Sequence, residues 1–162
     1  MTDTLPEIRN FLEQCRYPFE IWPCDPELAD TAAFCEHYGV SPEISANSIL
    51  VRSKTGEKKY VLCVVLATDR LNTNQTVRKK MGVHKVSFAS ADETREVTSM
   101  EIGGVTPIAL PESLPIWIDE AVMQCDYIIL GGGNRSSKIK VNPQALLQQQ
   151  SVEVVPQLAK RS

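Results

Sequence analysis

The sequence contains two neighbouring segments, Ser48-Ile-Leu-Val-Arg-Ser53 and Tyr60-Val-Leu-Cys-Val-Val-Leu-Ala67, that decide the fold. Both are rich in Ile, Leu and Val, which favour β-strands. The intervening Lys54-Thr-Gly-Glu57 contains a glycine, so the pair predicts a β-hairpin. Nearly every residue of the second segment is apolar, which indicates a central strand covered on both faces.

Further helices and strands are expected on both sides of this hairpin. Ser90 and Glu93 form a capping box at a helix start, and Gly39 and Gly82 mark helix ends. Because strands and helices are interspersed but hairpins occur, the predicted fold class is α+β: a curved, mixed, barrel-like sheet with helices packed outside it. Residues 1–162 are expected to form a single domain. The predicted helices cover residues 5–16, 26–38, 72–81, 90–97 and 143–149, and the other strands cover residues 19–22, 85–89, 116–118, 127–130, 138–141 and 152–155.

Composition excludes several classes of protein. No apolar run approaches the roughly 20 residues that span a bilayer, and the acidic, polar N-terminus is unlike a secretory signal. A cytoplasmic protein without a membrane partner is therefore expected. The net charge of −3 disfavours a protein that grips long DNA by its phosphates, but allows contact with the end of one RNA molecule. Five cysteines without a Cys-x-x-Cys pair predict neither a zinc site nor disulfides.

The usual hydrolytic motifs are missing, which leaves two glycine-rich loops as candidates. His37 and His84 are the only histidines, and neither a G-x-S-x-G nor an H-E-x-x-H motif occurs. The loops are Gly103-Gly-Val-Thr-Pro107 and Gly131-Gly-Gly-Asn-Arg135. Glycine lets a backbone approach a ligand closely, so such loops can hold an oxyanion, a ribose or a phosphate. Tight turns at strand ends would explain the same residues.

Charged side chains offer two weaker candidates. Asp119 ends a predicted strand, where a carboxylate anchors a loop or polarises a ligand. Basic residues cluster in two stretches, and besides being solvated they could form a positive rim that guides an RNA end. These basic residues are Arg52, Lys54, Lys58, Lys59, Arg78, Lys79, Lys80 and Lys85.

Several segments occur in an order that resembles one known family. They are VRKKMGVHKVSFAS at 77–90, VTSMEIGGVTPIAL at 97–110, LPIWIDEAV at 114–122 and YIILGGGNRSSKIKVNPQALL at 127–147. From about Phe19 to Leu158 the chain is similar to the YbaK-like, prolyl-tRNA-editing type of domain. That family has a Thr-Gly turn, a G-x-x-x-P loop, a strand ending in Asp and a Gly-rich turn with an Arg. Thr98, Gly103 to Pro107, Asp119 and Gly132 to Arg135 occupy those places.

The resemblance implies a fold, a reaction and a set of site residues. The reaction is hydrolysis, without metal or cofactor, of the ester between an amino acid and the terminal adenosine of tRNA, assisted by the ribose hydroxyl of the substrate. The implied partners are the tRNA acceptor end and an aminoacyl-tRNA synthetase. The catalytic positions are Asn47, Gly103, Gly104, Thr106 and Pro107, and the substrate-binding positions are Thr98, Val105, Asp119, Gly132, Gly133, Asn134 and Arg135.

Asn47 departs from the family pattern, which has a substrate-binding lysine there; a smaller departure is Ser99, which replaces a glycine. Asparagine carries no charge, and losing one such electrostatic contact typically costs about 3 kcal/mol, or roughly 100-fold in rate. Three explanations fit: a different substrate, a neighbouring Arg52 or Lys54 that reaches in, or binding without much hydrolysis.

Three functions remain open from the sequence. The first is a deacylase acting in trans, which is useful because a synthetase pocket separates similar small amino acids by only about 10–200-fold. The second is a module that binds an aminoacyl-like or nucleotide ligand, or an RNA end, without turnover. The third is a structural partner of a synthetase that uses its surface. The first two require residues around 47, 105, 119 and 133 to converge on one hollow.

Overall fold

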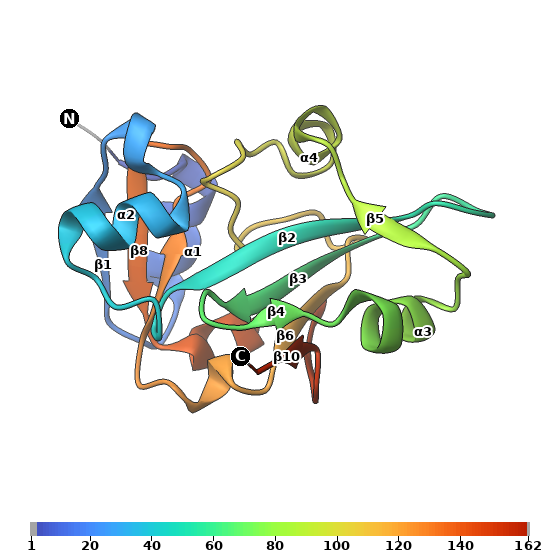
Figure 1. The fold of residues 1–162 in the computed structure, drawn as a ribbon. Coiled ribbons are helices and arrows are strands. Elements are labelled where there is room, and N and C mark those ends of the chain that lie inside the picture. Colours follow the sequence, from blue (N-terminus) through green and yellow to red (C-terminus); the bar gives the residue numbers. More distant parts are fainter. Residues whose placement is uncertain (1–2, 162) are drawn as a thin grey trace.

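A computed structural model describes residues 3–161 and places the hairpin at the centre of a five-stranded mixed sheet (Figure 1). The strand order is β5-β2-β3-β6-β9. Strand β2 is antiparallel to β3 and β5, whereas β6 is parallel to both β3 and β9. The predicted hairpin and its central second strand are thus confirmed. The strands are β5 (Val86–Phe88), β2 (Ala46–Ser53), β3 (Tyr60–Leu66), β6 (Ile116–Asp119) and β9 (Val152–Val155).

A second sheet of three antiparallel strands stands beside the first (Figure 1). It joins β1 (Phe19–Pro23), β8 (Ser137–Val141) and β7 (Ile128–Gly131), with β8 in the middle. A bridge between Ser45 and Ile129 links it to the start of β2. Because this link is a single bridge rather than a ladder, the two sheets do not close into a barrel. The expectation of a barrel-like sheet is therefore wrong in this respect, and the sheets stay open. A small third sheet pairs β4 (Arg70–Leu71) with β10 (Ala159–Lys160), and neither strand was predicted.

Strand β3 is buried on both faces, as its apolar sequence predicts. Leu62 and Val64 face a large core shared with α1 and the three-stranded sheet. Val61 and Cys63 face a smaller core that includes Trp117 and residues of the chain around α3. All five cysteines are free thiols.

The helices are shorter and less regular than the sequence patterns suggest. The predicted helix 26–38 breaks at Asp30, whose backbone is extended, into η1 (Pro26–Leu28) and α2 (Thr31–Tyr38). It ends, as expected, at Gly39, which adopts a left-handed φ of 67°. Within residues 3–161, no helix is long and apolar enough to cross a bilayer. The others are α1 (Pro6–Gln14), the π-helical η2 (Thr73–Val77), α3 (Arg78–Met81), α4 (Ala91–Thr98), η3 (Val122–Gln124) and the 3₁₀ helix η4 (Pro143–Gln148).

Glu93 connects α4 to the hairpin. Its carboxylate accepts the Ser90 N–H at 3.2 Å, which completes the predicted capping box. It also accepts the Tyr60 hydroxyl at 2.9 Å and the Arg52 guanidinium at 3.0 Å. The Ser90 N–H, the Tyr60 hydroxyl and the charge of Arg52 together lower the pKa of Glu93 from 4.5 to about 2.

Replacing Glu93 by glutamine is expected to lower the free energy of unfolding at neutral pH. A folded-state pKa below the unfolded value stabilises the protein above pH 4.5, and this contribution is lost as the pH falls towards 2. The difference between wild type and Glu93→Gln should therefore shrink across that range in urea denaturation. Glu96→Gln, an exposed change on the same helix, is the control and should show little difference at any pH. A gap for Glu93→Gln that does not depend on pH would contradict this account.

Candidate functional site

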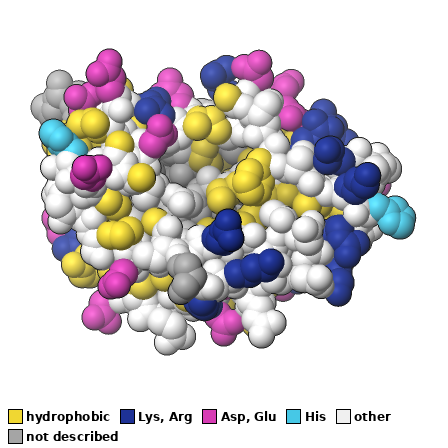
Figure 2. All heavy atoms as spheres, viewed as in Figure 1, with side chains coloured by type: hydrophobic (Ala, Val, Ile, Leu, Met, Phe, Trp, Pro, Cys, Tyr) yellow, Lys and Arg dark blue, Asp and Glu magenta, His cyan; other side chains and the backbone are white. Residues whose placement is uncertain are grey.

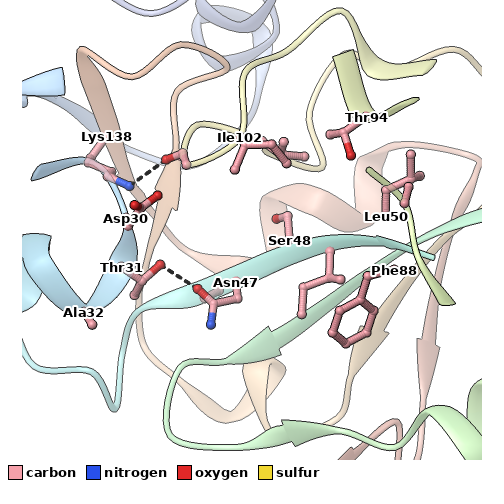
Figure 3. Close-up of a pocket in the computed structure, with 16 residues that line it drawn as sticks. Asp30, Thr31, Ala32, Asn47, Ser48, Leu50, Phe88, Thr94, Ile102 and Lys138 are labelled. Carbon is pink, nitrogen blue, oxygen red and sulfur yellow. Dashed lines mark hydrogen bonds between the residues drawn. The ribbon is translucent and has the colours of Figure 1, made fainter. Parts of the chain in front are cut away.

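A cavity of about 490 Å³ opens between the start of α2, strand β2 and the first glycine loop. Figure 2 shows the hollow among hydrophobic side chains, and Figure 3 shows its lining residues. Thr31 is the first residue of α2, and Asp30 precedes it. Asn47 and Ser48 belong to β2. Gly103 and Val105 come from the loop, Lys138 comes from β8, and Phe88 and Ile102 lie farther along the wall. Segments distant in sequence therefore converge on one hollow.

The two glycine loops pack backbone against backbone beside this cavity. The Gly133 N–H donates to the Gly104 carbonyl at 2.6 Å, and the Glu101 N–H donates to the Gly133 carbonyl at 3.2 Å. A Cβ atom on Gly131 would lie 2.6 Å from the Gly104 carbonyl oxygen, and one on Gly104 would overlap the Asn134 carbonyl. Glycine is required at both positions because no side chain fits between the loops.

Among the predicted site residues, Asn47, Gly103 and Val105 line the cavity. Gly132, Gly133 and Asn134 instead form the turn behind it, which the N-terminal segment covers. The Gly132 carbonyl accepts the Thr4 hydroxyl at 2.6 Å, and the Asn134 amide donates to the Asp3 carbonyl at 2.9 Å.

Arg135 holds the first glycine loop against the start of α2. Its guanidinium donates to the Pro26 carbonyl at 2.9 Å, to the Ile102 carbonyl at 2.7 Å and to the Asp30 carboxylate at 3.2 Å. Asp30 and Ile102 both line the cavity, although Arg135 itself does not. Arg135 therefore sets the spacing of two walls.

Three other predicted residues also lie behind the lining. The Thr98 hydroxyl donates to the Thr94 carbonyl at 2.6 Å and accepts the Met100 N–H at 3.1 Å, which closes the end of α4. The Pro107 carbonyl accepts the side-chain amide of Gln149 at 2.6 Å. Thr106 is fully buried, and its hydroxyl has no hydrogen-bond partner within residues 3–161.

Asp119 is fully buried at the end of β6, away from the residues that line the cavity. Its carboxylate accepts the backbone N–H groups of Ala121 at 3.2 Å and Ala159 at 3.1 Å. It also pairs with Arg161 at 2.9 Å. These contacts fasten the C-terminal segment to the sheet, as the loop-anchor alternative predicts. The expected convergence of residues around 47, 105, 119 and 133 is therefore wrong for Asp119, which contributes nothing to the lining of the hollow.

Asn47 lies in the cavity wall as a neutral, hydrogen-bonded side chain. Its carbonyl oxygen accepts the Thr31 hydroxyl at 2.5 Å (Figure 3). Arg52 and Lys54, the two neighbouring cations considered as replacements for a lysine here, do not line the cavity. Arg52 is engaged with Glu93 at 3.0 Å, and Lys54 is an exposed residue beyond the end of β2.

Lys138 is a cavity residue that the sequence patterns do not predict. Its ammonium donates to the Ala29 carbonyl at 2.5 Å. It also donates to the Gly103 carbonyl at 3.1 Å, a bond drawn in Figure 3. The side chain is only 5 % exposed, and burial lowers its pKa below the ordinary 10.5, although nearby Cys24 and Asp30 oppose the shift. In Ser137-Lys-Ile-Lys-Val141, lysines at alternate positions are typical of a solvated strand face, so the pattern does not indicate a buried site residue.

Asp30 is the only His, Cys, Asp or Glu residue among the described residues that line the cavity. Within residues 3–161, no group of three or more His, Cys, Asp or Glu side chains lies close enough together to hold a metal ion. The polar groups available at the cavity are therefore backbone amides and carbonyls, hydroxyls, one carboxamide, one carboxylate and one ammonium.

Comparison with known proteins identifies the family. The aminoacyl-tRNA editing domain family matches residues 25–148. The chain is 27 % identical over 143 residues to the uncharacterized protein YwhH of Bacillus subtilis, covering 88 % of each. It is 29 % identical over 100 residues to a proline--tRNA ligase of Bacillus licheniformis, covering 62 % of the chain but 16 % of the ligase.

Solved structures share the fold. The hypothetical protein APE2540 superposes with a TM-score of 0.81 at 21 % identity, covering 95 % of this chain and 99 % of that one. A protein proposed to be a trans-editing enzyme for prolyl tRNA synthetase superposes with a TM-score of 0.76 at 20 % identity, covering 99 % and 100 %. Since the family match spans most of the chain and agrees with the motifs in the sequence, the chain belongs to the YbaK-like aminoacyl-tRNA editing domain family.

Proposed function

We propose that this protein acts in trans to hydrolyse the ester bond that joins an incorrect amino acid to the terminal ribose of tRNA. The observation that carries this proposal is the cavity where Asn47, Lys138 and the backbone of Gly103 and Val105 meet. Its volume of about 490 Å³ falls in the range of about 300–1,000 Å³ that holds small organic ligands. An amino acid esterified to a nucleoside is a ligand of that size class.

The loop beside the cavity offers donors for the reaction. In the described chain, the backbone N–H groups of Gly103 and Val105 have no hydrogen-bond partner, whereas that of Gly104 donates to the Glu101 carbonyl at 2.8 Å. When water attacks the acyl carbon, the carbonyl oxygen becomes negatively charged, and unpaired N–H groups can stabilise that charge. Fixed donors of this kind support ester hydrolysis.

The distribution of charge supports an RNA partner. Although the net charge is −3, Lys and Arg side chains gather at the end of the molecule that carries α3 and the tip of the β2–β3 hairpin (Figure 2). A local positive surface attracts phosphates and raises the rate of encounter. Residues of these segments that are at least partly exposed are Lys54, Lys58, Lys59, Arg78, Lys79 and Lys85, whereas the charge of Lys80 is paired with Glu153 at 2.8 Å.

The test is release of amino acid from a panel of mischarged tRNAs incubated with the purified protein. At least one mischarged tRNA should be deacylated well above its spontaneous rate, and the same tRNA carrying its correct amino acid should be spared. Uniform stability of the whole panel would refute the proposal.

Binding without turnover is the second candidate, and Asn47 is the observation that favours it. The side chain is neutral, and its carbonyl oxygen is already occupied by Thr31. The variant Asn47→Lys separates the two functions. If only this variant hydrolyses mischarged tRNA, the native protein is a binding module, whereas we expect the native protein to be active already.

A further inference from the structure

Lys138 is the only Lys or Arg among the described residues that line the cavity. It belongs to β8, the middle strand of the three-stranded sheet, where it pairs with Gly131 on one side and Trp22 on the other. The strand that carries it is therefore held on both edges, so the base of the side chain is fixed.

The ammonium at the other end of the side chain is also fixed. Two of its three N–H groups donate to the carbonyls of Ala29 and Gly103, and its nitrogen lies 5.2 Å from the centre of the Phe34 ring. An ammonium has three donors, so one remains after these two bonds. A charged group that is 5 % exposed is costly to bury, and this one is positioned beside the loop that offers unpaired N–H groups.

Resting on the proposed function, we propose that Lys138 supplies from β8 the cation that stabilises the negative charge formed during ester hydrolysis, a role that Asn47 on β2 cannot perform. The remaining N–H of Lys138 would donate to the acyl carbonyl oxygen of the substrate. The bond to the Gly103 carbonyl keeps the ammonium next to the backbone donors of the same loop. The cation and the amides then act on one oxygen atom.

The reaction balances without any further reactant. The oxygen of a water molecule forms a bond to the acyl carbon, and the carbonyl electron pair moves onto the carbonyl oxygen beside Lys138. When this pair returns, the bond between the acyl carbon and the ribose oxygen breaks. The ribose oxygen receives one proton from the water, and the amino acid leaves as a carboxylate with release of the other proton.

The pH dependence of the deacylation rate distinguishes a catalytic Lys138 from a purely structural one, because only a catalytic lysine would make the rate follow its own titration. Four titratable or charged groups face the ammonium: Cys24, Asp30, Cys35 and Arg135. Burial is the largest influence and lowers the pKa of Lys138 below 10.5. The proposed role needs the charged form of Lys138, so the enzyme-catalysed rate should decline as the pH rises. Because the pKa of Lys138 is lowered, this decline should begin at a lower pH than it would for an exposed lysine. Lys138→Arg should move that decline to higher pH, because arginine stays charged.

The experiment compares four proteins on a mischarged tRNA that the wild type deacylates. Lys138→Met removes the charge but keeps much of the side-chain volume. Lys140→Met is the matched control, because Lys140 lies on the same strand but pairs with Glu20 at 3.4 Å and faces a different hollow. The double variant Asn47→Lys with Lys138→Met returns a cation to the cavity from β2. Thermal denaturation verifies that each variant is folded.

We expect kcat to fall about 100-fold in Lys138→Met, as when an oxyanion donor is lost, with KM changed much less. Lys140→Met should stay within about twofold of wild type, and the double variant should regain at least about tenfold over Lys138→Met. A folded Lys138→Met that keeps wild-type kcat would overturn the role of Lys138 and leave the proposed function intact. A loss that the added lysine does not rescue would also overturn it, by assigning Lys138 to the structure of the loops. Absence of wild-type hydrolysis would overturn both.

Discussion

Replacing Gly104 by alanine is expected to lower the free energy of unfolding by about 3 kcal/mol, at the upper end of what overpacking usually costs. The added Cβ would overlap the backbone carbonyl of Asn134, which cannot move aside as the end of a flexible side chain can. The two glycine loops would have to separate, which breaks the bond from the Gly133 N–H to the Gly104 carbonyl. Since Gly103 and Val105 line the cavity, deacylation should be lost together with stability.

Gly56→Ala is the control for this change. Gly56 lies in the turn of the β2–β3 hairpin with a φ of 73°, and a Cβ there would meet nothing within 4 Å. Its cost should be limited to that of a left-handed backbone, about 1 kcal/mol, with activity retained. Both variants can be measured by urea denaturation and by deacylation of the same tRNA. Equal costs for the two glycines would show that the contact between the loops is not tight.

Asp119→Ala should have the second-largest effect, a loss of about 3 kcal/mol in the free energy of unfolding, without a change in activity per folded molecule. The change leaves the backbone N–H groups of Ala121 and Ala159 without their carboxylate partner in a fully buried place. Each orphaned group costs about 1–3 kcal/mol. Arg161 adds little to the penalty, because its side chain is 49 % exposed and stays hydrated.

The matched control is Asp69→Ala. Asp69 pairs with the same Arg161 at 3.2 Å, so this variant removes an ion pair while leaving the Asp119 anchor in place. The Asp69 side chain is only 8 % exposed, but Arg161 is 49 % exposed and stays hydrated, so the loss should be about 1 kcal/mol. Thermal denaturation measures stability, and deacylation below the transition measures activity. A fully stable Asp119→Ala protein with weakened substrate binding would instead support the substrate-binding role that the family resemblance implies.

The parts of the fold that could be predicted are those determined by local sequence. The apolar run from Tyr60 indicates a strand covered on both faces, the Ser90–Glu93 pair fixes a helix start, and Gly39 ends a helix. The break at Asp30 could not be predicted, because its carboxylate binds Arg135, which is distant in the sequence, instead of capping the helix. The pairing of β4 with β10 likewise depends on residues far apart in the chain.

Some residues of the candidate site can likewise be predicted from local sequence, whereas others depend on contacts between distant segments. Glycine loops and Asn47 can be found from motifs because the family pattern places them. Lys138 cannot, since its sequence neighbours indicate a solvated strand, and only the approach of Ala29 and Gly103 turns that face into a buried wall. The contacts that Arg135 makes with the carbonyls of Pro26 and Ile102 also join segments far apart in the sequence.

The antiparallel ladder between β1 and β8 has a practical consequence for anyone who excises this unit as a fragment. The family match begins at residue 25, after β1. A fragment cut at that boundary would expose one flank of the strand that bears Lys138, and unpaired strand flanks invite self-association. It would also lack Thr4, which closes the second glycine turn. The folded unit is thus larger than the segment that the family match covers.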